Sequence, residues 1–397
     1  MIRARGLWVE VVQTLLRMLP WPCRTGVVSI GSPGRDAPVL LTGNFRLSVE
    51  RVRRALEGMD AYLLVANSRG VNVWCAATGG LLTNHDVVSV LKTSGIAELV
   101  DHRRVVLPQL AATGIEGPVV QRKTGWKVDW GPVEAEDIRA FLARGREASR
   151  AMRTVRFPWR QRLEMAVAWA FPISILALPL APIWAEGALS IAALVWGLSL
   201  LTFLAFPLGE RLAGGAEAKT GFGLSRLGER GLPLLLWLAL MAALALCVGL
   251  DEQPGWGALG RWGLLSFAVL LVLGLDLTGS TPVYKSGLHE DRLLRISLDA
   301  GACKGVGFCE QVCPKDVFEV DAERRLAALP RADACVQCGA CIVQCPFDAL
   351  SFEDASGGVV TPETVRRFKL NLMGHRRVSD ARARNGSGAS GTPPAST

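Results

Sequence analysis

Four long apolar runs separate an N-terminal region of mixed pattern from a more polar C-terminal region. The runs cover residues 165–183, 187–208, 232–250 and 257–275. Each has the roughly 20 residues that a membrane-spanning helix needs. Arg261 is the one charged side chain within them, and core helices of soluble proteins rarely stay apolar around their whole circumference. The pattern therefore predicts a four-helix transmembrane domain over residues 160–278 rather than a set of buried core helices.

Before the first run, short apolar segments alternate with helical patterns. The segments favour strands at residues 39–42, 62–66, 71–76 and 104–107, and the helical patterns cover residues 47–56 and 84–91. Such alternation is typical of a mostly parallel sheet with helices on its faces. We therefore expect an α/β domain over residues 26–145.

The two ends of the chain differ from these regions. Residues 1–25 place apolar side chains at helical spacing, and their polar interruptions (Glu10, Gln13 and Arg17) argue against a secretory signal. Two interpretations stay open for this amphipathic helix: it lies on a membrane surface, or it packs on its own domain. Residues 378–397 are rich in Ser, Gly, Pro, Ala and Arg, which predicts a disordered tail.

The charges are distributed unevenly around the apolar runs. The chain of 397 residues has 44 Lys and Arg against 36 Asp and Glu, and its mean hydropathy is +0.29. Residues 144–162 contain seven arginines, residues 209–231 four basic residues and residues 285–295 three, whereas residues 184–186 and 251–255 contain none. Loops rich in Lys and Arg stay in the cytoplasm. We expect a multi-pass protein of the inner membrane, in contact with membrane lipid, with both termini cytoplasmic and no nucleic-acid partner.

The C-terminal region carries a dense cysteine motif. Seven of the ten cysteines fall within 43 residues, and four of them follow the spacing Cys-x2-Cys-x2-Cys-x3-Cys-Pro, at Cys335, Cys338, Cys341 and Cys345. Bacterial iron–sulfur proteins use this spacing, and their fourth cysteine ligates the neighbouring cluster. A zinc site usually pairs two ligand couples across a longer gap, and disulfides are disfavoured on the reducing cytoplasmic side. The motif predicts iron–sulfur clusters.

A second, incomplete copy of the motif lies upstream. Cys303, Cys309 and Cys313 hold its first, third and fourth positions, while Val306 holds the second. Reciprocal ligation predicts two ligand sets. They are Cys313, Cys335, Cys338 and Cys341 for one complete [4Fe–4S] cluster, and Cys303, Cys309 and Cys345 for the other site. Because valine cannot ligate iron, we expect the second site to hold a [3Fe–4S] cluster or a [4Fe–4S] cluster whose odd iron takes an outside ligand.

The cysteine-rich region resembles the bacterial dicluster ferredoxins over residues 296–355. The resemblance rests on the two cysteine motifs and on the strand-like stretches at residues 317–320 and 349–352. It implies an α+β ferredoxin domain at this end of the chain.

Cys23, Cys75 and Cys247 lie outside these motifs. Cys247 falls in the third apolar run, where a thiol behaves as a small hydrophobe, and we assign no role to Cys23. Cys75 ends an apolar, strand-like run and precedes small residues and a helical pattern. Helix N–H groups stabilise a thiolate near such a junction. Residue chemistry alone favours a buried structural cysteine here and leaves a ligand as the alternative.

The residues around Cys75 carry a second resemblance. Asn72-Val73-Trp74-Cys75-Ala76-Ala77 is similar to the signature of the corrinoid protein of microbial mercury methylation, a relative of the corrinoid iron–sulfur protein of the acetyl-CoA pathway. The same order of corrinoid domain, spans and ferredoxin extends the likeness over nearly the whole chain, as a corrinoid protein fused to its ferredoxin partner. The resemblance implies a Rossmann-like corrinoid-binding domain, these six residues at the cofactor, and Cys75 as the lower axial ligand of cobalt.

The resemblance also implies a reaction and its partners. A pterin-dependent methyl donor protein would supply a methyl group, the corrinoid would pass it to a soft metal such as Hg(II), and the clusters would return electrons from a low-potential donor, in an anaerobic prokaryote. The alternative is a membrane-bound iron–sulfur electron-transfer protein whose N-terminal domain carries or senses a corrinoid without methylating mercury.

Two features depart from that family. Thr78-Gly79 stands where the signature commonly continues with Gly-Lys, so a basic group near the corrin is missing. No cysteine follows Cys345. Because soft mercury prefers thiolates, another protein must deliver it, or the acceptor is not mercury.

Overall fold

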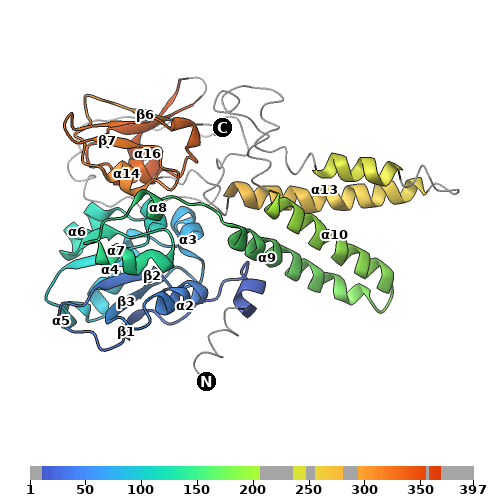
Figure 1. Cartoon of the computed structure of the whole chain (residues 1–397), viewed down its shortest axis with the longest axis horizontal. Helices are drawn as coiled ribbons and strands as arrows, with labels where there is room; N and C mark the ends of the chain where they lie inside the picture. The colour runs from blue at the N-terminus through green and yellow to red at the C-terminus, as the bar shows by residue number, and fades with distance from the viewer. Residues whose placement is uncertain (1–10, 206–235, 247–254, 280–293, 355–356, 368–397) are drawn as a thin grey trace, which may run out of the picture.

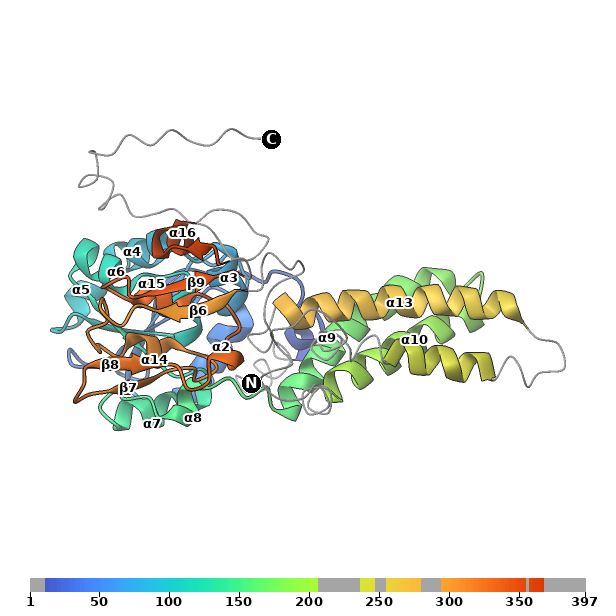
Figure 2. The same ribbon diagram turned by 90° about the horizontal axis from the view of Figure 1, so that it is seen from above.

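The computed structural model describes residues 11–205, 236–246, 255–279, 294–354 and 357–367. An α/β domain and a small C-terminal domain lie against each other, and a bundle of long helices extends to one side of them (Figures 1 and 2). The segments expected as a loop at residues 209–231 and as a tail at residues 378–397 lie outside the described residues, as does Cys247.

The N-terminal domain is built on one five-stranded sheet. Its strands are β1 (Gly26–Ile30), β2 (Val39–Gly43), β3 (Ala61–Ala66), β4 (Arg104–Leu107) and β5 (Lys127–Trp130). They lie in the order β1-β3-β2-β4-β5, and all pairs are parallel except β1 with β3. The prediction of a mostly parallel sheet is confirmed, with one antiparallel edge strand.

Helices cover both faces of this sheet. They are α2 (Arg46–Ala55), α3 (Val73–Gly79), α4 (Asn84–Thr93), α5 (Ile96–Leu99), η1 (Gln109–Thr113), α6 (Gly117–Thr124), η2 (Ala135–Asp137) and α7 (Ile138–Ala143). Neighbouring residues of one strand face opposite cores: Leu41 packs with Leu107 and Trp126, whereas Leu40 packs with Val106 and Phe141. Burial on both faces explains why the inner strands are continuously apolar rather than alternating.

One predicted strand of this domain is wrong, and two of its strands were not predicted. Residues 71–76 form no strand, because Asn72 caps a helix that begins at Val73 and already contains Cys75. Strands β1 and β5 were not expected. β5 alternates charged and apolar residues, and β1 is a partly exposed edge strand, so neither has the fully apolar run that marks an inner strand.

The helical bundle contains α9 (Trp159–Ala177), η3 (Leu178–Leu180), α10 (Ala185–Leu204), a helix at Leu236–Leu246 and α13 (Trp256–Gly279). Within the described residues two helices, not the expected four, are long and apolar enough to cross a membrane: Trp159–Leu180 and Ala185–Leu204. The third run is described only over the helix Leu236–Leu246. The fourth run lies in α13, where the shorter apolar stretch Leu259–Leu273 is the part with described side chains.

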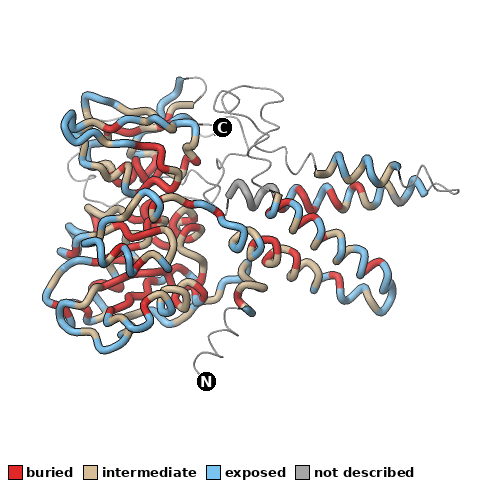
Figure 3. The backbone as a smooth tube through the Cα atoms, in the orientation of Figure 1, coloured by how far each residue is buried: buried red, intermediate tan, exposed pale blue. Residues whose placement is uncertain are grey.

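The bundle turns many apolar side chains outward. Figure 3 shows buried positions along its inner faces and exposed ones outside. Leu176 is 77% exposed and Ile183 is 89% exposed, and Leu189, Leu264 and Leu271 are exposed as well. A soluble protein rarely leaves so large an apolar surface uncovered.

The C-terminal domain consists of short strands and short helices. Its elements are β6 (Arg295–Leu298), α14 (Phe308–Val312), β7 (Glu319–Asp321), β8 (Leu326–Ala328), η6 (Ala332–Ala334), α15 (Ala340–Gln344), β9 (Leu350–Glu353), β10 (Val359–Val360) and α16 (Pro362–Arg367). One sheet has the order β10-β9-β6 and the other pairs β7 with β8. The α+β character expected for a ferredoxin domain is present in the described residues.

The start of the described chain packs on the protein itself. Residues 11–15 are helical, and the Gln13 side chain is buried. Arg17 forms an ion pair with Glu164 of α9 at 3.1 Å, and the backbone N–H of Trp21 donates to the carbonyl of Gly70 at 2.9 Å. Of the two interpretations of this segment, the described part agrees with packing on its own domain.

Candidate cofactor and iron–sulfur sites

Cys75 lies in the first turn of α3, where Asn72 holds it. The Asn72 Oδ1 accepts a hydrogen bond from the backbone N–H of Cys75 at 2.9 Å, and the Asn72 Nδ2 donates to the Cys75 Sγ at 3.3 Å. The first bond caps the helix, since Asn at the N-cap satisfies an N–H group that has no helical partner. The second orients the sulfur. Asn72 therefore fixes both the helix start and the thiol.

The thiol lines a cavity of about 420 Å³ at the carboxyl ends of the parallel strands. Thr42 lies near the end of β2, Pro108 follows β4 and Gly131 follows β5, and all three residues line the cavity. The chain passes from β2 to β3 on one side and then crosses to β4 on the other, which makes the β2–β4 gap the switch point of the sheet. Open α/β sheets bind ligands at this place, and ligand cavities typically measure about 300–1,000 Å³.

The structure divides the six residues of the predicted signature into two groups. Asn72, Val73, Trp74 and Cys75 line the cavity. Ala76 and Ala77 are fully buried, and Ala76 belongs to the core on one face of the sheet. A Cβ on Gly114 would lie only 2.7 Å from the carbonyl oxygen of Ala77, so the small residues here allow η1 to approach α3 closely.

The donor groups at the cavity fit a polar, metal-containing ligand. The Trp74 Nε1 is buried and has no hydrogen-bond partner in the described part of the chain. A buried donor without a partner costs about 1–3 kcal/mol, so a ligand that accepts from it would be stabilised. The Cys75 sulfur, held by Asn72, supplies a soft donor atom beside it.

The mouth of the cavity meets the first long apolar helix. Gln161 and Met165 of α9 line it, together with Phe157 just before the helix. Glu164 of the same helix pairs with Arg17 at 3.1 Å and with Arg51 of α2 at 2.8 Å. These pairs attach α9 to the α/β domain at the cavity.

Two buried cysteines of the C-terminal domain show which other thiols lie near them. Burial raises the pKa of the Cys341 thiol well above its usual range, and the negative charges of Cys338, Cys335 and Cys313, with that of Cys309, raise it further. Burial likewise raises the pKa of Cys309 to about 12, with added repulsion from Cys345 and Cys303. Each thiol thus repels mainly the partners of its own predicted ligand set.

These groups fit iron–sulfur clusters chemically. The described cysteines form no disulfide among themselves. Backbone N–H groups point at two of the sulfurs, that of Val317 at Cys313 Sγ (3.3 Å) and that of Gln337 at Cys335 Sγ (3.4 Å). Buried thiols with raised pKa values become ligands when a cation compensates their charge, and binding then releases protons. Over the described ranges, no three His, Cys, Asp or Glu side chains are placed to hold a single metal ion.

The two cysteine motifs begin their helices in the same way and differ in the residue before the helix start. Gly307 and Gly339, with φ of 78° and 73°, begin α14 and α15 in the left-handed conformation. Cys338 precedes the second glycine and packs against the core of the α/β domain. Val306 precedes the first and is 42% exposed. The missing ligand position therefore faces solvent.

The C-terminal domain is attached to the α/β domain by buried polar contacts. Gln344 of α15 donates through Nε2 to the carbonyl of Ala112 at 2.8 Å, and its Oε1 accepts from Gly117 N at 3.2 Å. Val312 and Ala340 join the hydrophobic core of the α/β domain.

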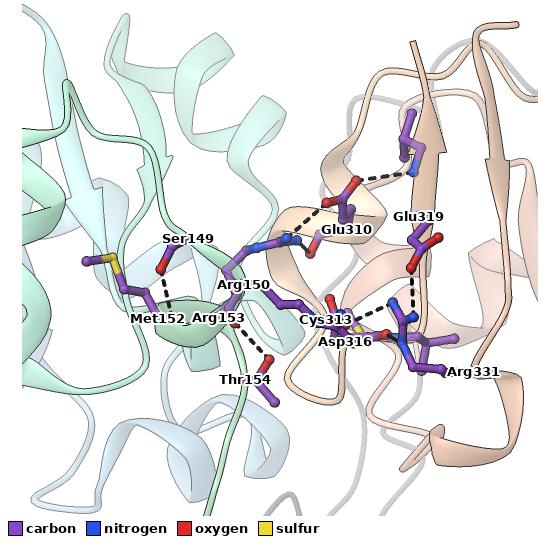
Figure 4. Close-up of polar contacts among 12 residues, drawn as sticks. Ser149, Arg150, Met152, Arg153, Thr154, Glu310, Cys313, Asp316, Glu319 and Arg331 are labelled. Carbon is purple, nitrogen blue, oxygen red and sulfur yellow. Dashed lines mark hydrogen bonds and ion pairs between the residues drawn. The ribbon is translucent and has the colours of Figure 1, made fainter.

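The linker helix α8 (Arg150–Arg153) makes the second set of contacts, shown in Figure 4. Arg153 Nη2 pairs with Glu310 Oε1 at 2.9 Å, and Arg150 Nε lies 2.5 Å from Asp316 Oδ2. Asp316 also pairs with Arg331 at 2.8 Å. Sequence reasoning missed the contacts of Arg150, Arg153 and Gln344, because no local pattern marks a polar side chain whose partner lies more than a hundred residues away.

Two protein-family models match this chain, one in each of the two globular domains. Residues 17–142 match the family model of the CO dehydrogenase/acetyl-CoA synthase delta subunit. Residues 330–351 match the 4Fe-4S binding domain. The chain therefore joins a domain of the first type to an iron–sulfur ferredoxin domain, as the sequence predicted in outline.

The similar curated proteins are gamma subunits of the acetyl-CoA decarbonylase/synthase complex. The subunit of Archaeoglobus fulgidus is 36% identical over 125 residues, which are 31% of this chain and 26% of that protein. The Methanopyrus kandleri subunit is 34% identical over 125 residues (31% and 27%), and gamma 2 of Methanosarcina mazei is 38% identical over 117 residues (28% and 24%). The chain spans about a quarter of the length of these relatives, and the likeness is confined to the α/β domain.

Proposed function

We propose that the protein is a membrane-anchored corrinoid methyl-transfer protein that is reduced by its own ferredoxin domain. The observation that carries the proposal is the placement of Cys75. Cys75 lines the cavity at the switch point of a sheet whose domain matches an acetyl-CoA synthase subunit family. A soft donor atom is thus held where this class of sheet binds its ligand.

Three residues that line the cavity would each hold the corrinoid in a different way. Cys75 would ligate the cobalt through its sulfur, which Asn72 orients, and the indole N–H of Trp74 would donate to a polar group of the cofactor. When bound, the corrinoid would supply a cobalt that carries a methyl group. The Cys75 thiolate would donate electron density to that cobalt, which would favour methyl transfer to an electrophilic soft metal such as Hg(II).

The ferredoxin domain serves as the reductant. Cys313, Cys335, Cys338 and Cys341 hold the complete [4Fe–4S] cluster, and Cys303, Cys309 and Cys345 hold the second, incomplete one. The mutual repulsion within each group of thiols supports this division. Because both domains share one chain, the reductant is present at high effective concentration. A low-potential donor replenishes the electrons, and a pterin-dependent protein supplies the methyl group.

The helical bundle anchors the protein in the cytoplasmic membrane. The exposed leucines of the bundle support this, because lipid would cover the surface that they form. Membrane spans that leave both termini in the cytoplasm would place the two globular domains on the same side of the membrane. The basic residues flanking the apolar runs favour that orientation.

The alternative is an iron–sulfur electron-transfer protein whose N-terminal domain carries or senses a corrinoid without methylating mercury. It would use the same cavity and the same two cysteine motifs. The two functions share the cofactors and differ in the acceptor.

Anaerobically purified protein reconstituted with cobalamin tests the proposal. We expect about one cobalt and about seven or eight irons per chain. The Cys75→Ala variant should lose the visible spectrum of thiolate-ligated corrinoid while keeping its iron. The Cys23→Ala variant serves as the matched control. Reconstituted protein without cobalt would overturn the proposal, and methylated protein that forms no methylmercury, even with added thiol carriers, would leave the alternative.

A further inference from the structure

The two iron–sulfur sites lie in different surroundings. Of the four cysteines assigned to the complete cluster, Cys338 packs against the hydrophobic core of the α/β domain. The other six cysteines of the two ligand sets pack within the core of the C-terminal domain itself. The position matching Cys338 in the other motif is Val306, which is 42% exposed. The complete cluster therefore has a ligand at the domain interface, and the second site opens to solvent.

Only η1 lies between the helix that follows Cys338 and the helix that contains Cys75. α15, which contains Cys341, packs on η1, and η1 packs on α3, which contains Cys75. The close approach of Gly114 to the backbone of Ala77 brings the end of η1 onto α3. Ala112, between these contacts, is fully buried. A continuous packed path thus joins the cysteine motif to the helix of the cobalt ligand.

Gln344 holds this interface. It lies on α15 between Cys341 and Cys345, and its side chain is 2% exposed. Its Nε2 donates to the carbonyls of Ala112 (2.8 Å) and Ile115 (2.5 Å), and its Oε1 accepts from the N–H of Gly117 (3.2 Å). All three partners are backbone groups of the α/β domain. A buried amide with every bond satisfied positions its helix specifically, and breaking the set leaves those groups unpaired.

We infer that the complete cluster is the one that delivers electrons into the α/β domain, with Cys338 as the ligand on the exit side and Gln344 as the positioning residue. The inference rests on the proposed function, since the corrinoid is the acceptor. One electron leaves the reduced cluster, which is oxidised by one unit, and the cobalt is reduced by one unit. A low-potential one-electron donor protein then restores the cluster by way of the solvent-facing second site.

The second set of interface contacts supports a permanent docking. Arg153 binds both the carboxylate and the backbone carbonyl of Glu310, and Val155 N donates to Pro314 O at 2.8 Å. These contacts attach α14 to the linker, whereas Gln344 attaches α15 to the sheet domain. With both cluster helices held, the C-terminal domain has a single orientation toward the α/β domain.

The test compares Gln344→Glu and Gln344→Met with Gln311→Glu in the full chain reconstituted with iron, sulfide and cobalamin. Glutamate at position 344 loses both donors and sets a carboxylate against two carbonyl oxygens, while Met keeps the volume. Gln311 lies exposed on α14 and is the matched control. We expect Gln344→Glu to slow cobalt reduction by prereduced clusters at least about tenfold, because small misplacements of reacting groups are costly. Gln344→Met should be slowed less, and Gln311→Glu should match the unmodified protein.

Four further readouts separate positioning from loss of fold. Iron and cobalt contents should stay unchanged, and titanium(III) citrate, which reduces cobalt directly, should do so at the same rate in every variant. The magnetic interaction between the reduced complete cluster and Co(II), seen by electron paramagnetic resonance, should weaken in Gln344→Glu. Hydrogen exchange at residues 109–117 should rise in that variant and stay unchanged in Gln311→Glu.

The outcomes distinguish the inference from the function on which it rests. Protein that takes up no corrinoid overturns the proposed function and the electron route with it. Protein that binds corrinoid but shows equal reduction rates and equal magnetic interaction in Gln344→Glu and the unmodified chain overturns the inference alone. Unchanged hydrogen exchange at residues 109–117 in Gln344→Glu overturns the role of Gln344 in docking.

Discussion

The side chain of Asn72 bonds to Cys75 through both of its polar atoms, Oδ1 to the backbone N–H at 2.9 Å and Nδ2 to Sγ at 3.3 Å. One residue thus starts helix α3 and aims the proposed cobalt ligand. The helix start and the position of the sulfur depend on different atoms of Asn72, so a mutation can remove one bond and keep the other.

Replacing Asn72 with Ala should remove both bonds. Loss of the N-cap should cost about 1 kcal/mol of stability, measured by chemical denaturation of the iron-loaded protein. Asn72→Asp keeps the cap acceptor and loses the donor to sulfur. It should restore most of the stability, while the visible spectrum of the bound corrinoid stays altered. A corrinoid spectrum identical in Asn72→Asp and the unmodified protein would show that Asn72 does not orient the sulfur.

The pairs of Glu164 with Arg17 and Arg51 should hold α9 over the cavity. Glu164→Gln should release this end of the helix, at a cost of about 0.5–1 kcal/mol, since the three side chains are partly exposed and the pairs are screened by solvent. Alkylation of Cys75 in corrinoid-free protein should become faster. The control is Glu50→Gln, which breaks only a surface pair with Arg53 on α2. Equal alkylation rates in the two variants would contradict this role of Glu164.

A cysteine at position 306 should complete the second ligand set. Val306→Cys should raise the iron content from about seven to about eight per chain if the site holds a [3Fe–4S] cluster, and should remove the resonance signal of an oxidised three-iron cluster. Val306→Ala, which adds no ligand, should change neither property. A Val306→Cys protein with unaltered iron content and spectra would argue that the site already holds four irons.

The raised pKa of Cys309 predicts a pH dependence of the iron-free protein. Burial favours the neutral thiol in the folded state, with a pKa of about 12 against 9.0 for the unperturbed group. Because the folded pKa is raised, its contribution to stability is complete below about pH 9 and is lost as the pH rises toward about 12.

Denaturation of iron-free protein at about pH 8 and about pH 10 measures this effect. Stability should fall at the higher pH, and Cys309→Ser should fall less, since serine does not ionise there. Iron-loaded protein should lack this dependence, because its thiolates are already ligated. An identical loss of stability in Cys309→Ser and the unmodified iron-free chain would assign the effect to other groups.

The elements that could be predicted share a local cause. β2, β3 and β4 are buried on both faces, so each appears as a continuous apolar run, and helices α2 and α4 show the spacing of one buried face. The prediction of a strand at residues 71–76 was wrong. Val71, Val73 and Trp74 have strand propensity, but the N-cap hydrogen bond of Asn72 starts a helix at Val73. Propensity is a weak signal when one side chain supplies a competing backbone bond.

The sequence by itself determined three local patterns that are readable without coordinates: the cysteine spacing of a ferredoxin domain, the run of residues around Cys75 that resembles a corrinoid signature, and the apolar runs. The tertiary structure decided where these groups lie. It brought Cys75 to the switch point of the sheet, turned Val306 to solvent and Cys338 toward the α/β core, and placed Gln344 among backbone groups of another domain. Such contacts join residues far apart in the chain, and they arise from packing and from the pairing of buried polar groups, which no local pattern encodes.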